Sequence, residues 1–99
     1  MDKWLYVMQI VKEKTYNRIT KAVITEHVEN LRRLDDDGKL ELCGVYKKYP
    51  GVAGMVILKA ESYEEAEELC RREPLVAGGF ASYTLHAIQV ADRENGYLL

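Results

Sequence analysis

The alternation of hydrophobic and polar residues divides the chain into four predicted strands and two predicted helices. Residues 4–11 (WLYVMQIV) are rich in aromatic and β-branched side chains, which is typical of a strand, and they are apolar at both odd and even positions. Neighbouring side chains of a strand point to opposite faces, so this strand predicts a sheet that is covered on both faces. The polar residues 12–18 predict a loop.

The period then changes to that of a helix. From Thr20 to Leu34 the apolar side chains recur every three or four residues, which predicts an amphipathic helix with one core-facing stripe. Residues 35–38 (DDDG) should end it, with Gly38 as a left-handed cap. The stripe consists of Val23, Ile24, His27, Val28, Leu31 and Leu34.

The rest of the chain predicts two strands, a second helix and a last strand. Residues 39–49 and 53–60 predict two strands, and Pro50-Gly51 between them predicts an antiparallel hairpin. A Ser-x-x-Glu capping box at 62–65 opens the second helix, which must end near Arg72 because Pro74 follows. Residues 75–79 predict a loop, and 80–90 the last strand.

The order strand, helix, strand, strand, helix, strand predicts an α+β fold with a four-stranded antiparallel sheet and both helices on one face. We found no linker or repeat, so residues 1–99 form a single predicted domain. Two short helices cover only one face, and apolar strand residues remain on the other. We therefore expect a homodimer joined through the sheet faces that the helices leave uncovered.

Composition and charge narrow the range of partners. The net charge is −2, with acids and bases interspersed, which argues against binding to nucleic acid or to an anionic membrane. No apolar run approaches the ~20 residues of a membrane span. Cys43 and Cys70 form no CxxC motif, so we expect no metal and no redox cofactor, and free thiols without a secretion signal predict a cytoplasmic location.

His27 is the first candidate for chemistry, because it interrupts the apolar stripe of the first helix where a leucine would pack more simply. A buried imidazole needs polar partners, so it either makes structural hydrogen bonds or borders a wet cavity. Spacing alone favours the structural interpretation. The functional interpretation is a general acid or base, since an imidazole gains and loses a proton near neutral pH.

Several motifs together resemble the YCII (YciI-like) family. They are TEHVENL at 25–31, DDGKL at 36–40, Cys43-Gly44, AESYEEA at 60–66 and EPLVAGG at 73–79. The resemblance spans nearly the whole chain in the right order. It implies a ferredoxin-like fold, a homodimer of the dimeric α+β barrel type, and a site built from a histidine and an aspartate.

Glu73 stands at the position of the family's aspartate and is the second candidate. By itself it would be interpreted as a solvated acid, one of several glutamates on the second helix. Pro74, however, forces Glu73 out of helical geometry, so its side chain can turn inward. We predict that Glu73 approaches His27 from the segment after the second helix.

The resemblance implies a small dimeric enzyme in which His27 and Glu73 carry protons during elimination, isomerisation or ring opening of a small molecule. Dehydrochlorination of a chlorinated aromatic compound is one activity associated with the family. Two alternatives remain open at this point. One is an enzyme similar to muconolactone isomerase, and the other is a non-catalytic module that binds a small ligand at a dimer interface.

Overall fold

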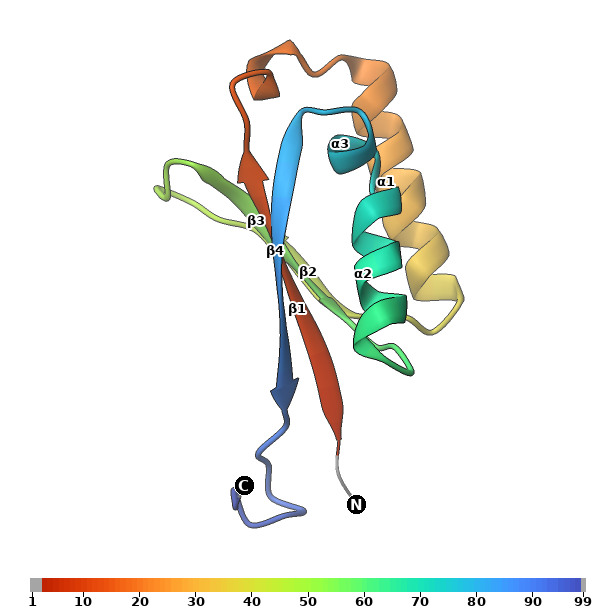
Figure 1. Ribbon diagram of the computed structural model, residues 1–99, viewed down its shortest axis with the longest axis vertical. Helices are drawn as coiled ribbons and strands as arrows, with labels where there is room; N and C mark the ends of the chain where they lie inside the picture. The colour runs from red at the N-terminus through yellow and green to blue at the C-terminus, as the bar shows by residue number, and fades with distance from the viewer. Residues whose placement is uncertain (1–2, 99) are drawn as a thin grey trace.

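The computed structural model describes residues 3–98, so Met1, Asp2 and Leu99 of the predicted domain lie outside the described residues (Figure 1). Its elements follow the predicted order, with two short helical segments added. They are β1 (Trp4–Lys12), the 3-10 turn η1 (Tyr16–Arg18), α1 (Lys21–Asp36), β2 (Leu40–Val45), β3 (Val52–Leu58), α2 (Tyr63–Arg72), α3 (Pro74–Ala77) and β4 (Ala81–Gln89).

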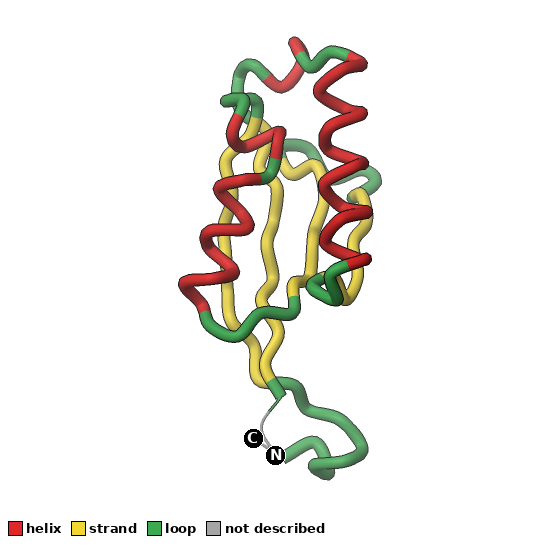
Figure 2. The backbone as a smooth tube through the Cα atoms, turned by 90° about the vertical axis from the view of Figure 1, so that its right-hand side faces the viewer, coloured by secondary structure: helices red, strands yellow, loops and turns green. Residues whose placement is uncertain are grey.

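The four strands form one antiparallel sheet in the order β2-β3-β1-β4. The helices lie on one face of it, as Figure 2 shows, where α1 and α2 run in front of the strands. This is the α+β, ferredoxin-like arrangement that the sequence predicts. Within the described residues, no helix has the length and apolar composition needed to cross a membrane.

The core lies between the sheet and the helices. Tyr6, Met8 and Ile10 of β1 are buried there, so the even positions of the strand face the helices. The odd positions, including Val7, face the opposite side of the sheet. Across the ladder Val7 pairs with Ile57 of β3 and His86 of β4. These side chains therefore share the face of the sheet that the helices leave uncovered, the open face.

The predicted helix ends agree with the structure. The Ser62 hydroxyl accepts a hydrogen bond from the backbone N–H of Glu65, and the Thr20 hydroxyl accepts one from Val23. Gly38 adopts a φ of 72°, and the following N–H, of Lys39, bonds to the carbonyl oxygen of Leu34. That is the Schellman arrangement, which requires a left-handed residue at Gly38.

Two boundaries differ from the prediction. The strand predicted over 39–49 ends at Val45, because the chain then turns through Lys48, whose φ is 59°, and Pro50 has no N–H to donate to a ladder. The loop predicted over 75–79 begins instead with α3, so residues 3–98 contain three α-helices, not two. Proline favours the first position of a helix, and Pro74 occupies that position.

Candidate functional site

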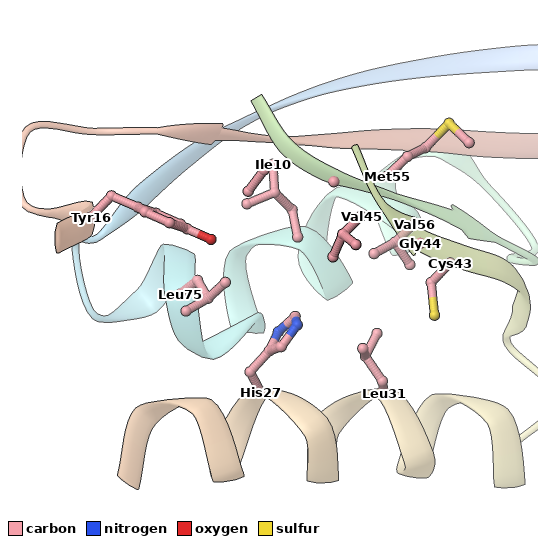
Figure 3. A pocket seen from close by; sticks show the side chains of 12 residues that line it. Ile10, Tyr16, His27, Leu31, Cys43, Gly44, Val45, Met55, Val56 and Leu75 are labelled. Atoms are coloured by element: carbon pink, nitrogen blue, oxygen red, sulfur yellow. The ribbon is translucent and has the colours of Figure 1, made fainter. Parts of the chain in front are cut away.

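His27 lies midway along α1 and points toward the sheet (Figure 3). Val23 and Leu31, one turn before and one turn after it, pack against the core. The helix therefore holds the imidazole between two side chains that are themselves fixed by packing. Its side chain is 19% exposed, which is neither a sealed core position nor a surface position.

Glu73 is the junction between two helices. It ends α2 and begins α3 with an extended backbone (φ −59°, ψ 127°), the geometry favoured before a proline. Its Oε2 accepts a hydrogen bond of 2.7 Å from the backbone N–H of Leu75. The residue is only 2% exposed and is the one charged residue in the buried part of the described chain. A buried carboxylate of this kind needs several hydrogen bonds to offset its desolvation.

The structure brings the two predicted site residues together. Nδ1–H of His27 donates a hydrogen bond to Oε1 of Glu73 across the space between α1 and α3. The predicted approach of Glu73 to His27 is therefore present. A carboxylate on Nδ1 fixes the ring orientation and the tautomer, and it leaves Nε2 with a free lone pair. The pair is arranged to accept a proton at Nε2.

The imidazole of His27 borders a cavity of about 140 Å³ between α1, α3 and the sheet (Figure 3). The walls are mainly aliphatic, with Leu31 from α1, Leu75 from α3 and Val56 from β3. Gly44 and Gly54 bring the backbones of β2 and β3 close together at its floor. An apolar pocket with a few convergent polar groups is the usual form of a small-molecule site.

Two further polar side chains line this cavity, and neither was predicted to be a site residue. Tyr16 belongs to the turn η1, within a segment predicted to be a polar loop. The sequence feature that could have identified Tyr16 is its aromatic ring among polar and charged neighbours. Cys43 of β2 is partly buried, and its sulfur is turned toward the cavity (Figure 3).

Cys70 and His86, which also carry potentially reactive side chains, lie elsewhere. Cys70 is fully buried in α2, and burial raises the pKa of its thiol to about 12, with repulsion from Glu67 adding to the effect. It is therefore a neutral, apolar core residue. His86 lies on the open face of the sheet, opposite Val7. Among residues 3–98, no three His, Cys, Asp or Glu side chains gather closely enough to hold a metal ion.

Comparisons with known proteins agree with this geometry at the level of the family and the fold. The chain is 29% identical over 82 residues to the uncharacterized protein YjpA of Bacillus subtilis (strain 168), an alignment that covers 83% of this chain and 91% of YjpA. Among solved structures it is similar to 5-chloro-2-hydroxyhydroquinone dehydrochlorinase (TftG) from Burkholderia phenoliruptrix AC1100, determined with 2,5-dihydroxybenzoquinone. That similarity has a TM-score of 0.60 and 14% identity, and it covers 83% of this chain and 90% of the other.

The identity to the dehydrochlorinase is low, so this likeness concerns the fold alone. The sequence of residues 4–89 matches the YCII-related domain, and this segment runs from the first residue of β1 to the last residue of β4. The chain therefore belongs to the YCII-related family.

Proposed function

We propose that the protein is a small-molecule enzyme in which His27 is the general base and Glu73 orients it. The observation that carries the proposal is the position of the pair. Glu73 holds Nδ1–H of His27, while the same imidazole lines an apolar cavity. A base held in one tautomer beside a mainly apolar pocket is suited to removing a proton from a bound molecule.

The proposed step begins with a substrate O–H or C–H bond directed at Nε2 of His27. The proton moves to Nε2, and the resulting imidazolium is stabilised by the carboxylate of Glu73. The electron pair of the broken bond forms a new double bond in the substrate. In an elimination, a leaving group then departs with its own bonding pair. In an isomerisation, the proton returns from Nε2 to a different substrate atom.

The neighbouring dehydrochlorinase supports elimination as the first reaction to test, since its name describes loss of HCl from a hydroxylated aromatic compound. Such a reaction needs a base for the hydroxyl proton, a proton for the ring carbon from which chloride departs, and a pocket that admits an aromatic ring. Here the base would be His27, and the aliphatic walls would contact the ring. The substrate of the present protein need not be the same compound.

The test is a reaction screen in D₂O with small carbonyl compounds and halogenated phenols, including 5-chloro-2-hydroxyhydroquinone. NMR would follow deuterium uptake, and a chloride assay would follow elimination. On any compound that reacts, His27→Gln should lower the rate about 10²–10⁴-fold, because the base is lost while an amide can still donate to Glu73. Glu26→Gln, an exposed change one residue away on α1, should leave the rate unchanged.

An equal rate in His27→Gln and wild type would contradict this proposal. Binding of the screened compounds without turnover would instead favour the non-catalytic ligand-binding alternative.

We also propose that the protein is a homodimer joined through the open face of the sheet. Apolar side chains gather there from all four strands, and several are well exposed, such as Leu42 at 57% and Ile88 at 41%. Val7 is central, between Ile57 and His86. A second copy would present the same apolar face, so the contact is self-complementary and closes as a two-fold dimer.

Val7→Lys should convert this dimer to a monomer, because it places a charge at the centre of an apolar contact. Sedimentation equilibrium at micromolar concentration would measure the mass, which is 11.4 kDa for one chain. Glu29→Lys, an exposed change on α1 at the other face of the sheet, is the matched control and should remain dimeric. A wild-type protein that sediments as a monomer would contradict the proposal.

A further inference from the structure

The size of the cavity beside His27 limits what can enter it. Its volume is about 140 Å³. An engineered apolar cavity of ~150 Å³ in another protein holds one benzene molecule. The space therefore matches a single six-membered ring with small substituents. Larger ligands would have to extend past the rim.

The charges around the cavity limit the ligand further. Within the described residues, neither lysine nor arginine lines it. The Nζ of Lys12 lies over the ring of Tyr16, 5.1 Å from its centroid, but Lys12 is not part of the wall. The charged group that contacts His27 is the carboxylate of Glu73. An anion that entered would lose hydration and meet no lysine or arginine, and the charge of a protonated His27 would already be balanced by Glu73.

Tyr16 supplies a polar group opposite the aliphatic walls. Two other tyrosines bond to groups of the domain itself, since Tyr46 donates to Sδ of Met55 and Tyr63 donates to the carbonyl oxygen of Leu85. The hydroxyl of Tyr16, in contrast, is directed into the same space as the imidazole of His27 (Figure 3). A hydroxyl in this position can donate to a ligand oxygen.

We infer that this cavity takes an uncharged molecule of about one ring in size, which bears an oxygen that accepts a hydrogen bond from the hydroxyl of Tyr16. Carboxylates and phosphates are excluded by the charge of the site. The inference deepens the function proposed for His27 and rests on the same cavity. It concerns which molecule binds, and it does not require that a proton be transferred.

Three probes of similar shape separate these features. Benzamide is uncharged and has a carbonyl oxygen, benzoate has nearly the same shape with a negative charge, and toluene has the ring without a polar group. Binding at neutral pH would be measured by titrating each into ¹⁵N-labelled protein and following the backbone amide NMR signals. We expect benzamide to shift the signals of residues around the cavity, and benzoate to bind at least about tenfold more weakly.

Tyr16→Phe tests the hydrogen bond while keeping the ring. It should weaken the binding of benzamide about three- to tenfold, which is the usual effect of losing one neutral hydrogen bond. Toluene should bind the variant and the wild type equally. If the role of Tyr16 were purely structural, Tyr16→Phe would change the affinities for benzamide and toluene together. That result would overturn the assignment of its hydroxyl.

Benzoate that binds as tightly as benzamide would overturn the exclusion of anions. Failure of all three probes to bind at the cavity would overturn the inference that it takes a molecule of one ring. Neither result would decide whether His27 transfers protons, because the reaction screen and His27→Gln measure that separately. Conversely, selective binding of benzamide by a protein that turns over none of the screened compounds would uphold this inference and count against the enzyme.

Discussion

The Glu73→Gln variant is expected to keep the fold and lose proton transfer. The amide oxygen of glutamine can still accept the N–H of Leu75, so the start of α3 is retained. Its NH₂ group, however, must now donate to Nδ1 of His27. The imidazole proton then moves to Nε2, which can no longer act as a base. The corresponding Asp-to-Asn change in a serine protease lowers kcat about 10⁴-fold by this route, and we expect a loss of about 10²–10⁴-fold here.

Two measurements separate this effect from unfolding. Imidazole ¹⁵N chemical shifts report which ring nitrogen carries the proton, and they should show Nε2 unprotonated in wild type and protonated in Glu73→Gln. Urea unfolding should show a far smaller loss of stability than in Glu73→Leu. The leucine leaves the buried N–H of Leu75 and Nδ1–H of His27 without acceptors, at about 1–3 kcal/mol for each group.

Glu68→Gln is the matched control on α2. Glu68 is exposed and pairs with Arg72 on the helix surface, so its loss should change stability by less than about 0.5 kcal/mol and leave the rate unchanged. If Glu73→Gln had the wild-type tautomer and the wild-type rate, Glu73 would have only the role of capping α3.

The Gly54→Ala variant is expected to be strongly destabilised. A Cβ at Gly54 would lie 2.4 Å from the carbonyl oxygen of Gly44 and 3.3 Å from Cα of Val45. Both are backbone atoms of β2, so relief requires the two strands to move apart. Overpacking of this kind costs about 1–3 kcal/mol, which for a domain of roughly 100 residues lowers Tm by about 4 °C or more. The same movement would open the floor of the cavity.

Gly44→Ala provides the control on the facing strand. A Cβ at Gly44 has no neighbour within 4 Å, so the added methyl group finds open space. Its main effect should be to restrict the unfolded chain, and a change between about zero and 1 kcal/mol in favour of the fold is expected. Thermal unfolding of the two variants under identical conditions would compare them. Equal Tm values would show that β2 and β3 tolerate a wider separation.

The local pattern was sufficient to predict the fold. Alternation in β1, the apolar stripe of α1 and the capping box at Ser62 each depend on neighbours within a few residues, and their order leaves one simple arrangement of the sheet. His27 was found in the same way, as an imidazole where the stripe required an apolar side chain. Glu73 was found through Pro74, which releases it from the helix, and through the motif of the Glu73–Gly79 segment.

The remainder of the site depends on contacts that no local pattern encodes. Tyr16 reaches the cavity only because η1 folds back beside α1 and α3. Cys43 reaches it only because β2 pairs with β3 at the register that places Cys43 opposite Val56. The helix α3 was missed because four residues carry too little periodicity to be recognised. It forms where Pro74 starts it and the Glu73 carboxylate caps it. The composition and charge of the cavity were decided by the packing of separate elements, since its walls come from two helices, a turn and three strands.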